Sequence, residues 1–588
     1  MDNTLYFFDD YCLDPAERTL TRRDQVVSLT PKAFDTLSLL VENSGRVVSK
    51  DLLLSRVWPQ TFIEENNLAV HISVLRKTLA AETEHEYIKT VPKRGYCFTA
   101  EVREEHTHAQ AQRPRSIAIL PFKVEDSNPD DRQRAVGLAD SIITRLSQIA
   151  SVAVSPTSSV IKYSEQDFDA LTVAKDLRVD SVLSGRLARV GDRLRLNVQL
   201  IGVETDTVLW ADRIDADSTD AFLYEDIISE HLAQSLGLHL TGEQFARLTK
   251  RHTESGDAYQ VYLQGRYYLA RRTAESLKKG VECFERATRI DPNYAPAYSG
   301  LSDCYTLLNY YGAFPSSVGR PKATAAAAKA IMADDALAEA HASTALVAFW
   351  YEWDWLRARI EFERALTLNP SYATARQWYC WYLCAIGQFE EAEKQGQLAL
   401  EIDPMATTTN MALVKCFFFS ERIDDTIRQC RRILALDETY LPACYFLGQA
   451  LVMKSLFDEA LAVYRKGMTT LGDLPIGRAV IAHAHALAGD RQTAEATLSA
   501  LIEMSQSGGA YVPAYALALI HTGLGNTKQA IEYLYKAFEE RFIWLVYLKV
   551  DPVFATLRED SHFNDLVAKM QFTQTAEFPA VAASTQMQ

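Results

Sequence analysis

The chain has 588 residues. A single hydrophobic core does not organise a chain of this length, so we expect three or four domains. Its 48% hydrophobic and 23% charged residues are typical of globular proteins, and no run of 18 apolar residues is present to cross a membrane. The net charge of −15 excludes a protein that binds nucleic acid over its whole surface.

The nine cysteines are scattered, odd in number and without paired CxxC motifs. This usage predicts small core residues in a reducing compartment, including Cys380 and Cys384 beside Trp378 and Trp381, and argues against metal ligands or disulfides. The acidic start of the chain lacks the basic and apolar segments of a secretory signal. We therefore expect a cytoplasmic protein, with no membrane partner, no metal and no cofactor.

Residues 1–105 predict a small α+β domain. Short alternating or aromatic runs between residues 4 and 28 indicate an antiparallel sheet. Thr30-Pro31 supplies an N-cap and a proline at the first helical position, and Gly45 follows the end of that helix. Ser49 caps a second helix that Pro59 closes.

The stretch from Glu64 to Phe98 predicts a third helix and a β-hairpin. Apolar residues fall on one helical stripe, at steps of four, three and four: Leu68, Ile72, Leu75 and Leu79. The opposite face carries Asn66, Val70, Ser73, Val74 and Lys77.

The hairpin has strands at 87–91 and 96–99, joined by the basic turn Pro92-Lys93-Arg94-Gly95. The first 105 residues hold 13 Lys+Arg against 17 Asp+Glu, but basic residues gather in and after the third helix: Arg76, Lys77, Lys89, Lys93 and Arg94. A helix with a small polar outer face, followed by a ribbon with a cationic tip, suits double-stranded DNA.

The pattern resembles the OmpR/PhoB-type winged helix-turn-helix family. The segments that carry the likeness are L-T-P-K-A-F-D-T-L-S-L-L (29–40), S-K-D-L-L-L-S-R-V-W (49–58), V-H-I-S-V-L-R-K-T-L (70–79) and I-K-T-V-P-K-R-G-Y (88–96). The resemblance implies that the helix at 64–80 enters the major groove and that the Lys93-Arg94 turn contacts the minor groove or backbone. His71 and Arg76 match positions that contact phosphate or support the helix. The expected DNA-binding residues are Asn66, Asn67, Val70, His71, Ser73, Val74, Arg76, Lys77, Lys93 and Arg94.

The outer face departs from the family at Ser73 and Val74, where members often carry arginine, the commonest reader of guanine. Asparagine reads adenine and valine meets a thymine methyl, so this face predicts an A·T-rich operator. The alternative is a domain that keeps the fold but binds DNA weakly or not at all. The family often binds direct repeats as a dimer, which implies a homodimer.

Residues 106–115 are polar and predict a linker. Residues 116–241 predict a small α/β domain that resembles the TolB amino-terminal-like domain through I-A-I-L-P-F, D-S-I-I-T-R-L and V-D-S-V-L-S-G-R-L. Gly185-Arg186 and Gly191-Asp192 are typical of hairpin glycines and form no phosphate loop. Ligand sensing, dimerisation and spacing all remain open for this domain. No receiver domain precedes the winged helix, so we expect control without a phosphorelay.

Residues 257–570 predict a helical solenoid, followed by a disordered tail at 571–588. Pro370 and Pro404 lie 34 residues apart, and small residues recur at the same interval at Ala392, Thr426, Ala460 and Ala494. The region resembles tetratricopeptide repeats, with about eight helix pairs, an insert near 314–321 and a capping helix near 554–570. Five tryptophans belong to the helix core or line a concave groove: Trp350, Trp353, Trp355, Trp378 and Trp381.

No GxSxG, HExxH or Walker motif is present, so we expect no enzyme. The first hypothesis is a bacterial DNA-binding transcriptional regulator, whose repeats receive a protein, peptide or small effector. The second is a scaffold that assembles proteins through the repeats, with weak or no DNA binding. A third is small-molecule sensing by the repeats.

Overall fold

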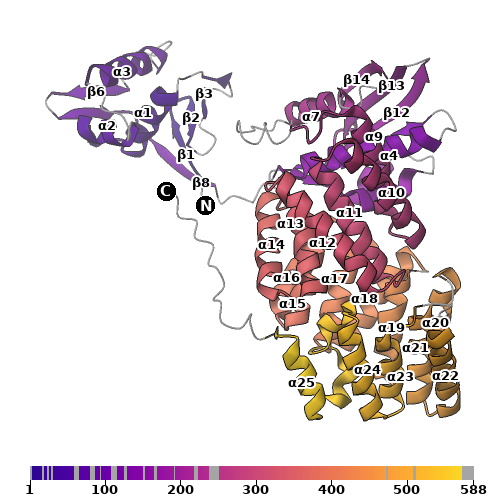
Figure 1. Ribbon diagram of the computed structural model, residues 1–588. Coiled ribbons are helices and arrows are strands. Elements are labelled where there is room, and N and C mark those ends of the chain that lie inside the picture. The colour runs from indigo at the N-terminus through magenta and orange to yellow at the C-terminus, as the bar shows by residue number, and fades with distance from the viewer. Residues whose placement is uncertain are drawn as a thin grey trace. The chain divides into compact units, whose positions relative to one another are not determined.

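The computed structural model describes residues 3–15, 19–22, 25–27, 29, 31–57, 65–79, 87–92, 94–107, 115–124, 129–149, 152–164, 169–190, 193–217, 223–236, 250–438, 440–471, 474–507 and 511–572. The chain divides into two compact units, Met1–Arg113 and Pro114–Gln588 (Figure 1). Several predicted features lie outside the described residues, namely Thr30, Pro59, Lys93, the Gly191-Asp192 turn, residues 108–114 of the linker and residues 573–588 of the tail.

The first unit holds two small antiparallel sheets and three helices. One sheet has the order β4-β3-β2-β1-β8, with β1 (Asn3–Phe8), β2 (Tyr11–Asp14), β3 (Thr19–Arg22), β4 (Gln25–Val26) and β8 (Arg103–Thr107). The other has the order β5-β7-β6, with β5 (Val47–Ser49), β6 (Ile88–Val91) and β7 (Gly95–Phe98). The helices are α1 (Pro31–Glu42), α2 (Lys50–Val57) and α3 (Glu65–Leu79).

Two of these strands have no counterpart among the predicted elements. β5 has only three residues, too few to show a period. β8 has the polar sequence R-E-E-H-T and pairs with β1 through its backbone, from Asn3 opposite Thr107 to Phe7 opposite Arg103. An edge strand requires no apolar alternation, so β8 occupies two positions of the predicted linker. The predicted cap of α2 is confirmed, because Ser49 Oγ accepts a hydrogen bond from the Leu52 amide at 3.2 Å.

An aromatic cluster joins the first sheet to the hairpin. The Phe8 ring meets Phe98 edge-on at 5.0 Å and stacks on Tyr11 at 5.3 Å, and Tyr87 packs against all three rings. The Tyr87 hydroxyl donates to Asp9 Oδ2 at 2.7 Å, and the Tyr11 hydroxyl donates to the carbonyl of Leu79 at 3.1 Å. The end of α3 and the base of the hairpin are therefore held by the same core.

The second unit begins with a mixed sheet in the order β11-β9-β12-β13-β14, with β10 paired to β12. The strands are β9 (Arg115–Ile119), β10 (Lys123–Val124), β11 (Val152–Val154), β12 (Ser181–Val190), β13 (Arg193–Gly202) and β14 (Thr207–Asp217). β9 runs parallel to β11 and β12, whereas β12, β13 and β14 form the antiparallel set that the sequence predicts. The helices of this part are α4 (Pro129–Leu146), α5 (Thr157–Val160), η1 (Ile161–Ser164), α6 (Ala170–Leu177) and α7 (Leu223–Ser235).

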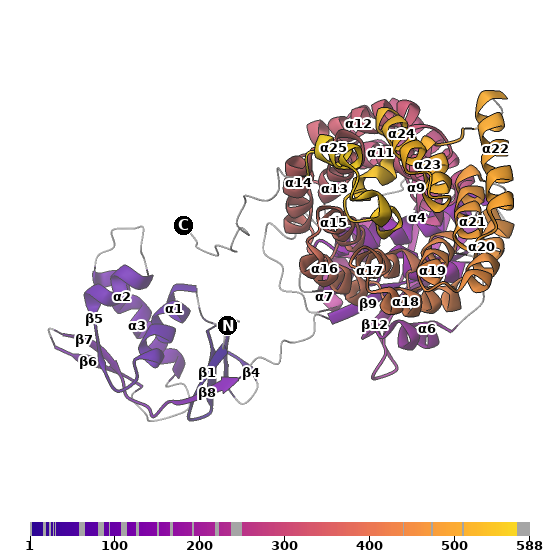
Figure 2. The same ribbon diagram turned by 90° about the horizontal axis from the view of Figure 1, so that it is seen from below.

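The helical repeats curve into a superhelix, seen end-on in Figure 2. Its described helix pairs are α9–α10 (Gly256–Arg271, Ala274–Ile290), α11–α12 (Ala295–Tyr310, Ser316–Ala333), α13–α14 (Ala338–Val347, Trp355–Leu368), α15–α16 (Ala373–Ile386, Phe389–Ile402), α17–α18 (Thr407–Phe419, Ile423–Leu436), α19–α20 (Leu441–Met453, Phe457–Leu471), α21–α22 (Pro475–Leu487, Arg491–Ser507) and α23–α24 (Ala514–Gly523, Thr527–Glu539). The π-turn η2 (Ala348–Glu352), two 3₁₀ turns, η3 (Ile543–Tyr547) and η4 (Pro552–Leu557), and the final helix α25 (Ser561–Lys569) complete the unit.

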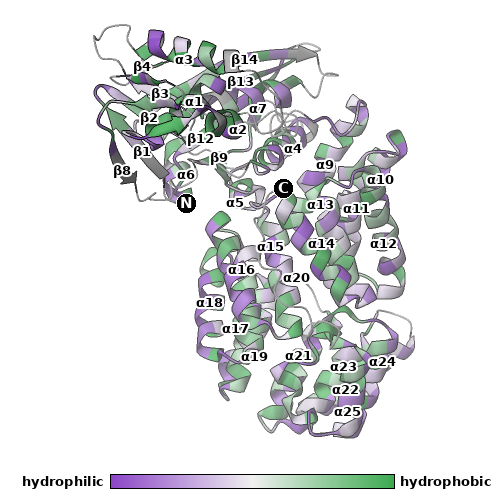
Figure 3. Ribbon diagram, turned by 90° about the vertical axis from the view of Figure 1, so that its left-hand side faces the viewer, coloured by the Kyte–Doolittle hydropathy of each residue, from purple (hydrophilic) through white to green (hydrophobic). Residues whose placement is uncertain are grey.

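The periodic small residues lie where the helices of a pair meet. Ala392, Thr426, Ala460, Ala494 and Ala530 are fully buried, one in each second helix from α16 to α24. Outer helices such as α18 carry many hydrophilic residues, whereas α19 is mainly hydrophobic (Figure 3). The fold class predicted from the sequence, a winged helix, a small α/β part and an all-α repeat superhelix, is thereby confirmed.

The predicted insert near 314–321 is different in the structure. Residues from Ser316 onward form the first turns of α12, and Pro321 lies inside that helix. Proline is a poor helix residue away from the first turn, which explains why the sequence pattern suggested a break there. The five tryptophans named above are all buried, as the core interpretation predicts.

The α/β part packs directly on the first repeats. Gly137 of α4 permits this contact, because a Cβ at that position would lie 2.6 Å from the carbonyl oxygen of Leu263 in α9. Buried ion pairs surround the contact: Arg145 Nε lies 2.6 Å from Glu225 Oε1, and Arg266 Nε lies 2.5 Å from Asp140 Oδ2. Because one of these pairs joins α4 to α9, separating the two parts would leave buried charges unpaired.

Candidate nucleic-acid interface

Helix α3 has one buried face and one exposed face. Leu68, Ile72, Leu75 and Leu79 are at most 1% exposed and pack into the core of the first unit. On the other side, Val70 is 59% exposed and Val74 is 41% exposed, with Ser73 and Lys77 also exposed. Val70 and Val74 lie one helical turn apart, so their exposed side chains form a small apolar patch next to the polar residues of this face.

Asn66 and Asn67 lie in the first turn of α3, but their side chains fall outside the described part of the chain. His71 is half-buried on the flank of the same helix. The structure thus brings the described members of the predicted set onto α3 and the hairpin next to it.

Arg76 serves the fold. Its Nε and Nη2 atoms donate to the carbonyl oxygen of Ile88 at 2.8 and 2.7 Å, and Nη2 also donates to Thr90 Oγ1 at 2.8 Å. The guanidinium therefore ties the last turn of α3 to β6. Of the two roles that the sequence allowed for Arg76, phosphate contact or support of the helix, the geometry shows the second.

Other cations of this surface are available to a ligand. Lys77 at the end of α3, Lys89 on β6 and Arg94 in the turn are exposed, and within the described residues their side chains have no carboxylate partner. Unpaired cations beside an exposed helical face are what a phosphate backbone attracts. Lys89 was not among the predicted site residues, although its alternation with Ile88 along the strand gives the signal that finds it.

The turn between β6 and β7 needs glycine at position 95. Its φ of +144° is rarely adopted by other residues, and a Cβ there would lie 2.0 Å from the carbonyl oxygen of Val48 in β5. β7 can therefore lie between β5 and β6, which holds Arg94 at the tip of the hairpin.

Comparison with known families agrees with this geometry. Residues 24–98 match the family described as "Transcriptional regulatory protein, C terminal". The chain belongs, through these residues, to the OmpR/PhoB-type winged helix-turn-helix family. The hairpin β6–β7 is the wing, and α3 is the recognition helix of the winged helix. A solved structure of the Klebsiella pneumoniae RstA DNA-binding domain, in complex with the RstA box, is 30% identical over 16% of this chain and 96% of that one, with a TM-score of 0.15.

The remaining regions also match known families. Residues 112–231 match the second domain of HilA/YgeH-like transcriptional regulators, and residues 514–541 match a tetratricopeptide repeat. The transcriptional regulator HilA of Salmonella typhimurium is 27% identical over 431 residues, which cover 73% of this chain and 76% of HilA. A putative adenylate cyclase 3 of Rhizobium meliloti is 29% identical over 40% of each chain. The likeness of the middle residues to TolB amino-terminal-like domains stays a prediction.

Proposed function

We propose that the protein is a transcriptional regulator that reads DNA through α3 and uses the wing to hold the phosphate backbone or the minor groove. The observation that carries the proposal is the two-sided α3, whose exposed face carries Val70, Val74 and Lys77, together with the exposed cations Lys89 and Arg94 of the hairpin that Arg76 ties to α3. A recognition helix in the major groove presents such a face to base edges, while neighbouring cations contact phosphates.

In this proposal the base-reading residues are Val70, Ser73 and Val74, together with Asn66 and Asn67. Valine contacts thymine methyl groups and asparagine pairs with adenine, which favours A·T-rich sites. Lys77, Lys93 and Arg94, with Lys89 added from the structure, supply contacts that do not depend on base sequence. His71 is assigned to the backbone at the flank of α3, and Arg76 positions α3 against the wing.

The second unit is assigned to control. The α/β part and the repeats share one continuous core, so a partner or effector bound by the repeats acts on the α/β part as well. No described helix is long and apolar enough to cross a membrane. We assign the protein to the cytoplasm, as a homodimer on DNA, with a regulatory and not an enzymatic role.

The proposal is tested by gel-shift titration of the full chain against the DNA upstream of its own coding sequence. A shuffled fragment of equal length and composition is the control. We expect specific binding at least 10³-fold tighter than binding to the shuffled fragment at physiological salt. Equal binding to both fragments, or none at low salt, would favour the alternative function as a protein scaffold.

A further inference from the structure

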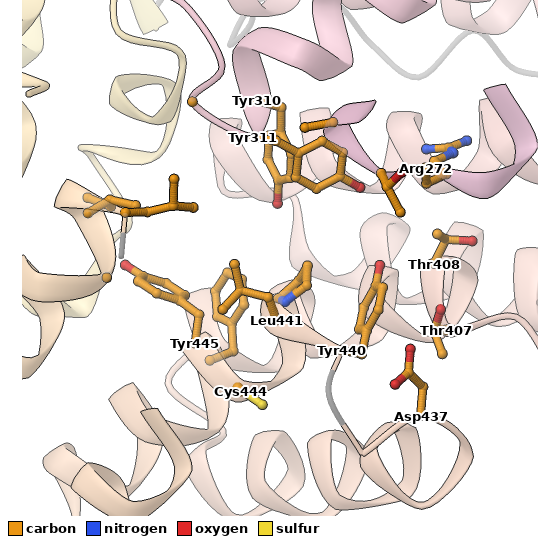
Figure 4. A pocket seen from close by; sticks show the side chains of 18 of the residues that line it. Arg272, Tyr310, Tyr311, Thr407, Thr408, Asp437, Tyr440, Leu441, Cys444 and Tyr445 are labelled. Atoms are coloured by element: carbon orange, nitrogen blue, oxygen red, sulfur yellow. The ribbon is translucent and has the colours of Figure 1, made fainter. Parts of the chain in front are cut away.

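The concave side of the superhelix encloses a cavity of about 800 Å³. Its walls come from α9, α10, α11, α17, α19, α20, α21 and α23, and η1 and the turn between α9 and α10 also line it. In Figure 4, Tyr310 and Tyr311 at the end of α11 face Tyr440 and Tyr445 at the start of α19 across this space. A cavity of this volume is in the range that holds one small organic molecule.

The C-terminal segment, residues 542–572, contributes part of the cavity lining through Phe542, Trp544, Tyr547 and Asp551. Trp544 packs against Tyr310 at 6.2 Å and Tyr445 at 5.1 Å, and Tyr547 stacks on Phe419 at 4.4 Å. Farther along, Trp355 Nε1 donates to the carbonyl of Met570 at 2.8 Å, which anchors the end of the segment. The C-terminal segment therefore adds aromatic rings to one side of the pocket.

Lys415 is the one charge in the apolar run M-A-L-V-K-C-F-F-F of α17, and it lines this pocket at 2% exposure. Its Nζ lies 3.7 Å from the centroid of the Trp381 ring and 3.2 Å from the Tyr547 hydroxyl. No carboxylate of the described chain lies within ion-pair distance of it. A buried ammonium group is costly unless it is paired, and aromatic rings compensate only part of that cost.

The charged residues of the pocket lining are mostly basic. Although the protein carries a net charge of −15, the lining holds more cations than acids: Lys162, Arg271, Arg272, Lys278 and Lys415, against Asp437 and Asp551. Asp551 is occupied within the protein, because it accepts from the Tyr515 hydroxyl at 3.2 Å and the Val553 amide at 3.0 Å. Arg272 lies at the edge of the pocket, on the same side as Thr408 (Figure 4), and its guanidinium has no carboxylate within ion-pair distance among the described residues. The pocket thus offers unpaired positive charge inside aromatic walls.

We propose that this pocket binds a small organic acid with a flat apolar body, whose anionic group pairs with Lys415 while the body lies between the rings of α11, α19 and the C-terminal segment. The proposal names the effector class for the control role assigned above to the repeats. Ser158, Ile161 and Lys162 of the α/β part also line the pocket, and the Ser158 and Ser159 hydroxyls donate to Asp403 between α16 and α17. The pocket is therefore bordered by both parts of the second unit.

The test compares two fluorescent probes of the same shape on the full chain, without DNA. 8-Anilinonaphthalene-1-sulfonate carries an anionic group, whereas N-phenyl-1-naphthylamine has the same rings and no charge. We expect one sulfonate probe per chain, bound at least about tenfold tighter than the neutral probe, because a charge-assisted pair adds on the order of a tenfold affinity or more. In the Lys415→Met variant we expect that preference to disappear, with the neutral probe bound within about twofold of wild type.

The matched control is Lys528→Met, which removes an exposed lysine of α24 outside the lining and should leave both affinities unchanged. A second measurement needs no variant: 1-naphthoate should displace the sulfonate probe from the wild-type chain, and the uncharged 1-naphthamide should not. Equal displacement by the two compounds, equal binding of the two probes, or an unchanged preference in Lys415→Met would overturn the proposal. Since the assay contains no DNA, its failure would leave the DNA-binding proposal intact.

Discussion

Arg76 of α3 donates two hydrogen bonds to the carbonyl oxygen of Ile88 in β6, at 2.8 and 2.7 Å. The recognition helix and the wing are thereby held by one side chain, and the planar guanidinium fork is the group that makes both bonds at once. Helix and wing must keep a set spacing to contact a groove and the adjacent backbone together, so this pair sets the geometry of the proposed DNA-binding surface.

Replacement of Arg76 by alanine should therefore weaken the fold as well as DNA binding. We expect a loss of about 1–2 kcal/mol in the free energy of unfolding of the first unit, since a part-buried carbonyl loses a charged donor. Lys77→Ala removes the adjacent exposed cation and is the control, with unchanged stability and weaker binding. Urea unfolding and gel-shift titration of both variants separate the two effects. Equal stability of the two variants would contradict the supporting role of Arg76.

Gly95→Ala should be among the most damaging single-methyl changes in the first unit. The added Cβ would lie 2.0 Å from the Val48 carbonyl oxygen at a φ of +144°, so β5 and β7 must separate. We expect a loss of roughly 3 kcal/mol or more. Gly45→Ala is the matched control: its φ is +73°, but no atom lies within 4 Å of the new Cβ, so we expect about 1 kcal/mol. Thermal unfolding of both variants measures the difference.

The exposed valines of α3 should set base preference without affecting stability. Val70→Ala together with Val74→Ala removes side chains that are 59% and 41% exposed, so the melting temperature should stay within about one degree. Selection of bound sequences from a random DNA pool should show reduced preference for thymine, by about 1 kcal/mol per lost methyl contact. An unaltered sequence preference would exclude these valines from base reading.

Lys415 should make stability depend on pH in a defined direction. Burial lowers the pKa of Lys415 to about 7 from an ordinary value of 10.5. The folded state therefore binds fewer protons than the unfolded state between these values, so Lys415 makes stability increase with pH from about 7 to 10.5. The titratable groups around it are Tyr310, Tyr547, Cys380 and Cys384, and burial also raises the pKa of Cys384 and both tyrosines, which keeps them neutral.

In Lys415→Met we expect the second unit to be more stable than wild type at pH 7, by roughly 3–5 kcal/mol, with the difference shrinking as the pH approaches 10. Chemical unfolding of the two proteins at pH 7, 8.5 and 10 measures this. A variant that is less stable than wild type at pH 7 would show that Lys415 is a structural residue whose cation–π contacts outweigh its burial.

Hydrophobic periodicity and helix caps predicted the helices of the first unit. Strands that form only because a neighbouring strand pairs with them were not predicted. The stripe from Leu68 to Leu79 gave α3 and its exposed face, whereas β8 has a polar sequence and exists because β1 offers it an unpaired edge. Arg76 could be assigned to phosphate or to support from sequence, and only the position of the Ile88 carbonyl decides between them.

The pocket illustrates the same limit. A single lysine in the apolar α17 is a visible signal in the sequence, yet its partners Trp381 and Tyr547 lie 34 and 132 residues away along the chain. A helical repeat pattern predicts the concave surface but not the C-terminal segment that folds back into it, because η3 and η4 have no helical period to detect.

The measurement that tests DNA reading by the winged helix most directly is the salt dependence of binding by the double variant Lys93→Ala/Arg94→Ala. The affinity of wild-type and variant chains for the upstream fragment is measured by gel shift from 50 to 200 mM salt. If the wing contacts phosphates, the variant binds specific and shuffled DNA more weakly by similar factors, and the slope of log K against log salt falls by about 1.8 units. Unchanged affinity and an unchanged slope would contradict the assignment of the wing to DNA.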